Sequence, residues 1–463
     1  MLDLSLNGAQ VVTPGGVQVA CVGVQDGLIH SVTDTPLAAR TSLDASGKLL
    51  LPGVVDLHVH FSEPGRGHWE GWASGSQAAA AGGVTTVVEM PLNAIPATTN
   101  VAALDLKLAA ARAHSLVDFA LWGGLMEDNR PDLRPLHEAG VMGFKAFMLE
   151  INDGSFRYAP DHILYTGMRE LARLGTRLAV HAENSALIHG LSRDLQAQGR
   201  TDPRAWLEAH PPVSELDAVR RALLFAQDTG CRLHVAHVSL PEAARDILAA
   251  RERGQDVTYE VCAHHLTLTD LDFERLGAVA KCAPPLRDAA RVEALWALVL
   301  AGEVDCVTSD HSPCPEEDKA TANIWDAWGG INGIQLTLPL MLDEGARRGL
   351  PLEQLARLLS ERPAQLAGLG HRKGAIRAGL DADLVLVDPD APWTLTQGHL
   401  KSLHPWSPFL GRRFRHKVER VYRRGEALFG GGQVAGSAGG EWLRPEWPRS
   451  ELGKLQDLPI MGR

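Results

Sequence analysis

The chain has 463 residues, 45% hydrophobic and 22% charged, which is typical of a globular protein long enough for an α/β barrel with an appended module. Its formal net charge is −11 without any block of Lys or Arg, so we expect neither nucleic acid nor an anionic membrane as a partner. No apolar run approaches the roughly 18 residues that cross a bilayer, and six scattered cysteines follow an N-terminus without a secretory pattern, so we expect a soluble, cytoplasmic protein with reduced thiols.

The two ends of the chain predict a small β module. In residues 1–50, short apolar runs alternate with turn signals at Pro14-Gly15-Gly16 and Asp26-Gly27, which is typical of hairpins. The segments 382–388 and 418–422 have the same character. We therefore predict that residues 1–50 and 372–463 form one β-sandwich module. The stretch after Gly430 is rich in Gly, Pro and Trp and carries no assignable pattern.

Residues 51–371 alternate strand and helix patterns eight times, which predicts parallel βα units and hence a (β/α)8 TIM-like barrel of the α/β class. The helical segments are rich in alanine and leucine, and several stop at a glycine, as at Gly82, Gly175 and Gly230. The predicted strands are Val54–His60, Thr85–Met90, Phe119–Trp122, Gly143–Met148, Leu178–His181, Leu233–His237, Val257–Val261 and Cys306–Asp310.

The first predicted strand, within the segment VVDLHVHFSE at 54–63, ends in His58 and His60. Residues two apart on a strand point the same way, so both imidazoles reach one point in space. Imidazole is the commonest metal ligand at neutral pH, and this pair supplies half of a coordination sphere. Alone, the pair could equally be two surface histidines on a solvated edge strand.

Other strand ends add polar groups at the mouth where barrel enzymes place their chemistry. They are Lys145, His181, His237 and Asp310. Singly, either histidine could be a hydrogen-bonded core imidazole, Asp310 a helix N-cap and Lys145 a snorkelling side chain. Jointly they favour a metal site, because a barrel does not need these groups for stability and burying unpaired charge is costly.

Four histidines and a carboxylate exceed the three protein ligands of a usual mononuclear catalytic zinc, so we expect two metal ions. Zinc is the first candidate, although such ligands also suit manganese, iron and cobalt. An ammonium has no lone pair and would repel both cations. Lys145 must therefore be neutral, displaced or converted to an anion.

The chain resembles the cyclic amidohydrolases, the family that contains dihydroorotase, hydantoinase, dihydropyrimidinase and allantoinase. The resemblance covers nearly the whole chain and rests on the segments 51–60, 143–147, 181–183, 237–239 and 309–313. It implies that Lys145 is carboxylated by CO2 and that the carbamate bridges two metals. It further implies that His58 and His60 hold one metal, which Asp310 completes, that His181 and His237 hold the other, and that the chain forms a homotetramer.

Within this family the segments 63–66, 69–71, 89–96 and 327–331 most resemble the allantoinase branch. Two positions depart from its siblings. Ser62 stands where dihydroorotases usually have an arginine for the substrate carboxylate, and Glu150 stands where hydantoinases and dihydropyrimidinases usually have a tyrosine for the developing oxyanion. Glu150 does not match an allantoinase either, so the donor to the oxyanion is not identified.

These observations predict the hydrolysis of a cyclic amide, with the ring opening of allantoin to allantoate as the first hypothesis. Asp310 is the predicted catalytic acid and base, taking the proton of the attacking hydroxide and passing it to the departing ring nitrogen. The candidates for substrate contact are Asn93, Gly330 of the Gly329-Gly330 turn, and Cys282 with Ala283; ordinary loop geometry explains them nearly as well.

Two alternatives stay open. One is a hydantoinase-, dihydropyrimidinase- or dihydroorotase-type hydrolase, which a panel of cyclic amides would distinguish. The other is a non-catalytic scaffold with an amidohydrolase-like barrel, which metal content would exclude. The scaffold is disfavoured because every expected ligand position holds a ligating residue type.

Overall fold

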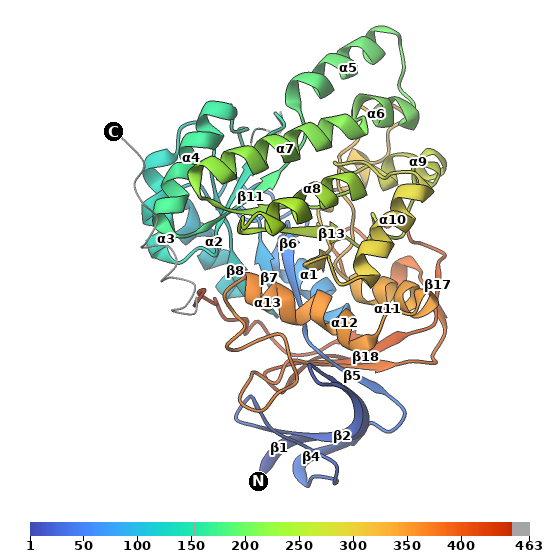
Figure 1. The fold of residues 1–463 in the computed structure, drawn as a ribbon. Helices are drawn as coiled ribbons and strands as arrows, with labels where there is room; N and C mark the ends of the chain where they lie inside the picture. Colours follow the sequence, from blue (N-terminus) through green and yellow to red (C-terminus); the bar gives the residue numbers. More distant parts are fainter. Residues whose placement is uncertain (152–153, 155, 447–463) are drawn as a thin grey trace.

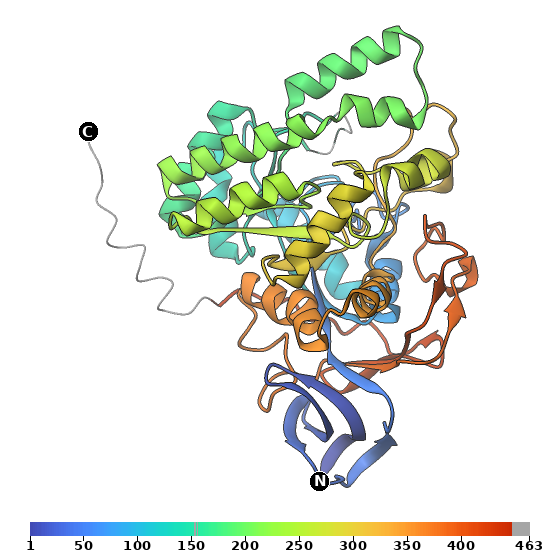
Figure 2. The same ribbon diagram turned by 45° about the vertical axis from the view of Figure 1, so that its right-hand side comes forward.

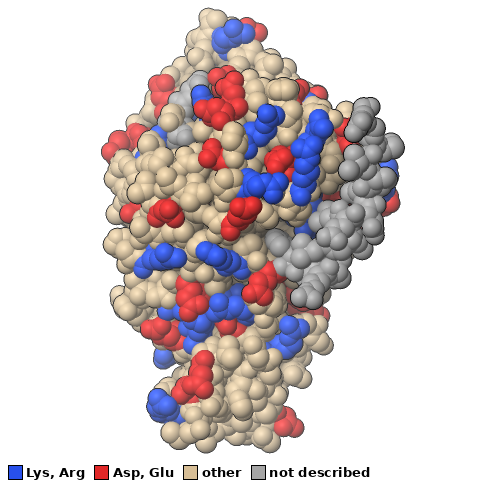
Figure 3. Space-filling model, turned by 90° about the vertical axis from the view of Figure 1, so that its left-hand side faces the viewer, with Lys and Arg blue, Asp and Glu red and all other residues tan. Residues whose placement is uncertain are grey.

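The computed structural model describes residues 1–151, 154 and 156–446, and in it a helix-covered barrel stands on a sheet made from both ends of the chain (Figure 1). Within this described part, no helix is long and apolar enough to cross a membrane. Lys and Arg alternate with Asp and Glu over the face seen in Figure 3. The part of the predicted tail at 447–463 lies outside the described residues.

Eight parallel strand positions form the barrel. They are occupied by β6 (Val54–Val59), β7 (Val84–Glu89), β8 (Asp118–Leu121) continued by β9 (Gly123–Gly124), β10 (Phe144–Phe147), β11 (Arg177–His181), β12 (Arg232–Val235), β13 (Val257–Cys262) and β14 (Cys306–Thr308). One sheet runs β6-β7-β8 and the other β14-β13-β12-β11-β10-β9. β8 and β9 link them on one side, and a parallel bridge between Val59 and His311 joins β6 to the β14 end on the other. The TIM-barrel prediction is confirmed.

The barrel strands are buried from end to end, since helices cover the outside and side chains fill the inside. Each predicted strand overlaps an observed one. Two predicted strands are too long at the barrel mouth, where the chain turns. His237 and Asp310, their predicted last residues, lie beyond the last paired residues, with φ of 36° and 44°. These two residues therefore lie on strained turns that aim their side chains, as functional residues often do.

The helices surround the barrel and continue over its upper end (Figure 1). The glycines at Gly175 and Gly230 end their helices in the left-handed conformation, as predicted, whereas Gly82 stays right-handed and the reversal falls on Gly83, with φ of 86°. The α-helices are α1 (Gly71–Ala81), α2 (Val101–His114), α3 (Leu133–Ala139), α4 (Asp161–Leu174), α5 (Ser185–Ala197), α6 (Pro203–Ala209), α7 (Pro212–Thr229), α8 (Pro241–Glu252), α9 (Asp270–Leu276), α10 (Ala289–Leu300), α11 (Thr337–Arg348), α12 (Leu352–Ala356) and α13 (Arg362–Leu366). Short helical turns lie at Arg130–Asp132, Gly277–Ala280, Glu316–Asp318, Arg357–Glu361 (a π-turn) and Gln397–His399.

Both ends of the chain enter one nine-stranded sheet below the barrel, as predicted (Figure 2). β5 pairs with β15 antiparallel and so joins the N-terminal strands to the C-terminal ones. The strands are β1 (Leu2–Thr13), β2 (Gly16–Gln25), β3 (Leu28–Thr33), β4 (Ala39–Asp44), β5 (Leu49–Pro52), β15 (Leu384–Asp388), β18 (Lys417–Arg423), β19 (Glu426–Gly430) and β20 (Gln433–Val434), beside a separate pair of β16 (Trp393–Thr394) and β17 (Arg413–Phe414). A buried cluster with members from both ends, such as Leu6 and Leu384, fills the module.

The stretch after Gly430, which the sequence left unassigned, reaches back to the barrel. The Phe119 N–H on β8 donates to the Glu441 carbonyl at 2.9 Å, and the Leu443 N–H donates to the Phe119 carbonyl at 2.8 Å. Leu443 is buried among residues of the barrel interior, such as Trp122. This segment occupies the edge of β8 just before β9 begins to pair with β10.

Candidate metal centre

His58 and His60 share one carboxylate oxygen. Their Nε2 atoms lie 3.2 Å and 3.3 Å from Asp310 Oδ1, so three side chains from β6 and from the turn after β14 meet at one point. Burial favours the neutral carboxyl, yet His58 and His60 outweigh it and hold the pKa of Asp310 well below its usual value. Asp310 is therefore ionised at neutral pH.

Glu260, on β13, sets the orientation of His58. The His58 Nδ1 makes a short hydrogen bond to one Glu260 oxygen, which also accepts the His237 backbone N–H at 3.2 Å. The other Glu260 oxygen lies 3.2 Å from Nε2 of His234. Because His58 donates through Nδ1, its Nε2 keeps a lone pair toward Asp310, which is how a metal-binding histidine is usually held.

His181 and His237 form the second pair. His181 Nδ1 lies 3.0 Å from His237 Nε2, so both nitrogens could coordinate one cation. The other nitrogen of His181 is 2.9 Å from Glu183, whose second oxygen is 2.8 Å from Nδ1 of His210. The Phe147 ring stacks on His181 with centroids 4.5 Å apart. This histidine is thus fixed on two sides.

Lys145 is fully buried on β10, and its Nζ has no hydrogen-bond partner among the described residues. Burial lowers the pKa of Lys145 to about 8, so about a tenth of the amine is neutral at pH 7, far more than for an exposed lysine. The charge of Lys145 lowers the pKa of His58, His181 and His237, which places it against both histidine pairs. A buried amine without a partner fits a position that is completed by another group.

The predicted ligand residues therefore lie together at the end of the barrel. His58, His237 and Asp310 present ligand atoms within 4.8 Å of one another, and the distances given above attach His60 and His181 to them. The donor set of imidazoles and a carboxylate is one that divalent transition metals bind.

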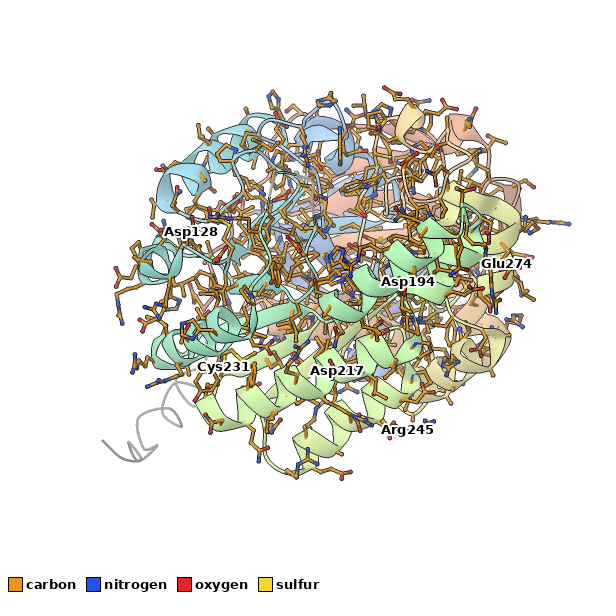
Figure 4. The ribbon with its side chains drawn as sticks, turned by 90° about the horizontal axis from the view of Figure 1, so that it is seen from above. Asp128, Asp194, Asp217, Cys231, Arg245 and Glu274 are labelled. Carbon is orange, nitrogen blue, oxygen red and sulfur yellow. The ribbon has the colours of Figure 1, made fainter. Side chains whose placement is uncertain are left out.

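A cavity of about 440 Å³ opens above these residues. Figure 4 views this end of the molecule, with α5, which carries the labelled Asp194, lying across it. The floor holds the four metal-site histidines and Asp310, and the walls mix apolar and polar side chains. The polar wall residues are Asn93, Glu150, His189, Ser192, Gln196, His210, Lys281 and Ser312.

The predicted substrate contacts are only partly at the cavity. Asn93, with φ of 65°, and Ala283 line it. Gly330 and Cys282 are not among the lining residues: Gly329 takes the place of its neighbour, the Gly330 N–H donates to the Lys281 carbonyl at 2.9 Å, and Cys282 is buried.

Sequence reasoning missed the groups that orient the ligands and those that face the substrate. Glu260 is the one charged residue in a strand that is buried throughout, which is a signal that could have identified it. Helix α5 contributes His189, Ser192 and Gln196 at the spacing of one helix face. That spacing is visible in the sequence, but nothing local shows that α5 crosses the barrel mouth.

Comparison with known proteins agrees with this geometry. Residues 49–428 match the amidohydrolase family. The chain is 50% identical to an allantoinase of Rubrobacter xylanophilus, over 97% of the chain and 99% of the relative. An allantoinase of Escherichia coli is 40% identical over 92% of the chain and 95% of the relative. Among solved structures, the L-hydantoinase (dihydropyrimidinase) from Arthrobacter aurescens superposes with a TM-score of 0.93 at 35% identity, covering 96% of this chain and 100% of the other.

Proposed function

Since the chain belongs to the amidohydrolase family, we propose that it hydrolyses a small-molecule cyclic amide, and that this amide is allantoin, which it opens to allantoate. The observation that carries the proposal is the 40–50% identity to allantoinases over nearly the whole chain. The matched range, 49–428, includes every residue of the group described above. The hydantoinases among the solved relatives support the reaction class, at lower identity.

Members of this family generally bind divalent metals, and the residues here fit two such ions. His58 and His60 would hold one ion together with Asp310, and His181 and His237 would hold the other. The ions, zinc being our first choice, would supply a water-derived nucleophile at neutral pH and polarise the ring carbonyl. The support for two ions is that four imidazoles and one carboxylate line one floor, which is more than the three protein ligands that a single catalytic zinc ion usually takes.

We further propose that Lys145 is a carbamate in the active protein. The neutral amine would attack CO2, forming a nitrogen–carbon bond and releasing one proton, and the product would carry one negative charge shared by two oxygens that can act as metal ligands. Three features of Lys145 support this: its complete burial, its Nζ without a partner in the described part of the chain, and its lowered pKa. An ammonium at this place would repel both cations.

Asp310 is positioned to move the proton. Its carboxylate is ionised at neutral pH and lies on the floor of the cavity, so it can accept a proton from the attacking water. It would then return the proton to the ring nitrogen as the amide bond breaks. The same carboxylate would thus take up the proton and release it again. Asn93 and Ala283 would contact the substrate, and the α5 face with Ser192 and Gln196 would read its ureido arm.

The assembly and the compartment are also proposals. A homotetramer follows from the family resemblance, and sedimentation analysis would measure it. A cytoplasmic location is supported by six cysteines that are all buried and unpaired.

A panel of four compounds tests the substrate. We expect kcat/KM to be far higher for allantoin than for dihydroorotate, dihydrouracil or hydantoin, with one metal-loaded preparation. Dihydroorotate carries a carboxylate that needs a cationic partner when buried. Ser62 is neutral and does not line the cavity, and Lys281, which does, already donates to the Ile324 and Ala327 carbonyls at 2.7 Å and 2.6 Å. Hydantoin and dihydrouracil lack the ureido arm, so polar groups that serve it would be left unpaired.

The same panel can contradict the proposal at two levels. If dihydroorotate or dihydrouracil is the best substrate, allantoin is wrong while ring hydrolysis survives. If none is hydrolysed at full metal occupancy, ring hydrolysis itself is wrong.

A further inference from the structure

A second group of metal-ligating side chains lies behind the wall of the cavity. Cys262 is the last residue of β13, and His264 and His265 follow it in the turn at the strand end. All three are buried, with exposed fractions of 0%, 2% and 3%. Their ligand atoms lie within 4.8 Å of one another, and none of the three lines the cavity. The reaction proposed above uses none of them.

The hydrogen bonds of the two imidazoles leave a lone pair on each. His265 Nε2 donates to the Pro284 carbonyl at 3.0 Å, so its Nδ1 is the unprotonated nitrogen of the neutral ring. His264 hydrogen-bonds to the Ser309 backbone, which leaves its Nε2. Within the described chain, neither His265 Nδ1 nor His264 Nε2 has a hydrogen-bond partner. Buried polar atoms without a partner are rare and indicate a missing ligand or water.

The chemistry of the third member decides between these two. A water would meet only the two imidazole nitrogens, whereas a metal ion would also use the third group, a thiol, which is a weak hydrogen-bonding group but a strong ligand once it loses its proton. Among the described residues, the hydrogen-bond partner of Cys262 Sγ is Thr308 Oγ1, at 3.7 Å. Burial lowers the pKa of both histidines, that of His265 to about 4, so both rings are neutral and able to coordinate. The same burial raises the pKa of the Cys262 thiol, so the bound ion itself has to displace the thiol proton.

We propose that Cys262, His264 and His265 bind a third metal ion of the thiolate-preferring class, such as Zn²⁺, separate from the centre on the cavity floor. Two imidazoles and one thiolate are donors that zinc accepts in tetrahedral sites, with the fourth position left to water. Binding forms one metal–sulfur bond and releases the thiol proton to solvent. Because His265 is bonded to Pro284, and Ala283 beside it lines the cavity, the ion would brace that wall.

Cobalt provides a probe that distinguishes the two centres. The proposed ligands on the cavity floor are nitrogen and oxygen only, so a thiolate-to-cobalt charge-transfer band reports a cysteine ligand. The metal-free full-length protein is titrated with Co²⁺, and bound cobalt and near-ultraviolet absorption are measured together. We expect three ions per chain and the band in the wild type, and two ions without the band in Cys262→Ser. Cys231→Ser, which changes another buried thiol, should behave as the wild type.

Two further outcomes make the test decisive. His265→Gln, which keeps the thiol and can still donate to the Pro284 carbonyl, should retain the band but bind the third ion at least about tenfold more weakly. A wild type that saturates without the band, or a band that persists in Cys262→Ser, would overturn the proposal. The test is independent of the proposed function, since the band does not require turnover.

Discussion

Asp310 lies next to the other predicted metal ligands and also faces the cavity in which the substrate would bind. Its oxygen lies against His58 and His60, and its backbone has a φ of 44°, so the turn after β14 holds the carboxylate where a substrate on the floor can reach it. We expect Asp310→Asn to keep the fold and to lower kcat by roughly 10²–10⁴-fold or more, because an amide cannot accept the proton. Turnover is measured beside metal content. More than about a tenth of the wild-type rate would contradict the role of Asp310.

Replacement of Lys145 tests the proposal that this residue is a carbamate. Lys145→Ala removes the two carbamate oxygens that would hold the ions together, so we expect turnover to vanish and bound metal to fall. Short carboxylates such as acetate or propionate should restore part of the activity, because they can occupy the space left by the carbamate. The same carboxylates added to the wild type serve as the control and should not activate it. Full activity of Lys145→Ala after metal removal would exclude the carbamate.

Glu70 links the stability of the protein to pH. It is buried at the start of α1, where it accepts the Leu403 N–H at 3.2 Å, and burial raises its pKa to about 8. The Nε2 atom of His311 lies 3.9 Å from the Glu70 carboxyl, and burial lowers the pKa of His311 to about 3, which keeps it neutral. Between the unfolded pKa near 4.5 and pH 8, the folded state therefore holds more protons than the unfolded state. The contribution of Glu70 to the free energy of unfolding is therefore complete below pH 4.5 and is lost as the pH rises through 8.

The expected result for Glu70→Gln is a shallower loss of stability with pH. The amide can still accept the Leu403 N–H but cannot titrate, so up to about 1.4 kcal/mol per pH unit of the decline should disappear between pH 5 and 8. Urea unfolding at several pH values measures this. Glu252→Gln, at an exposed glutamate of α8, is the matched control. Parallel stability profiles for the wild type and Glu70→Gln would show that Glu70 does not titrate in this window.

At the scale of elements, local sequence was sufficient for the barrel strands. Each is a short apolar run buried on both faces, and such runs between helical segments are distinctive. The same runs placed the ligand residues, since parallel strands end at one mouth. Their exact ends were not predictable: Asp310 lies two residues beyond β14 because pairing stops where the chain must turn to aim that side chain.

What the sequence did not reveal depends on distant contacts. The role of Glu260 requires His58, which is 202 residues away, and the face of α5 matters only because α5 lies over the cavity. Cys282 and Gly330 were assigned from their loops, but the backbone carries them just outside the lining. Position within a loop does not determine which neighbour faces inward.

At the scale of the whole molecule, the module and the barrel are connected by buried ions as well as by the shared sheet. Lys373, which follows α13, is completely buried between Asp118 of β8 and Asp383 of the module, at 2.6 Å and 2.8 Å. These two carboxylates raise the pKa of Lys373 against the opposing effect of its burial. The two parts of the chain therefore depend on each other for compensation of buried charge.

The segment 439–446 belongs to the same connection, and its removal is the last prediction. It pairs with β8 through Phe119, its Glu441 N–H donates to Asp118 at 2.9 Å, and Leu443 fills the lower barrel. Without it, backbone groups of β8 lose their partners and a buried leucine site is emptied. We expect a chain ending at Ala438 to be less stable than one ending at Glu446 by at least about 3–6 kcal/mol, counting only the buried leucine and the three hydrogen bonds just named.

Comparing these two truncations isolates the segment, because both lack the same residues beyond Glu446. Denaturant unfolding of the metal-loaded proteins gives the difference in free energy, and cobalt binding shows whether the metal group survives. The predicted metal ligands lie at the carboxyl ends of the strands, whereas the segment pairs with the start of β8. We therefore expect the truncation to lower the free energy of unfolding while the folded protein still binds cobalt. Equal free energies would mean that β8 finds other partners for Phe119, and that the barrel closes without the returning end of the chain.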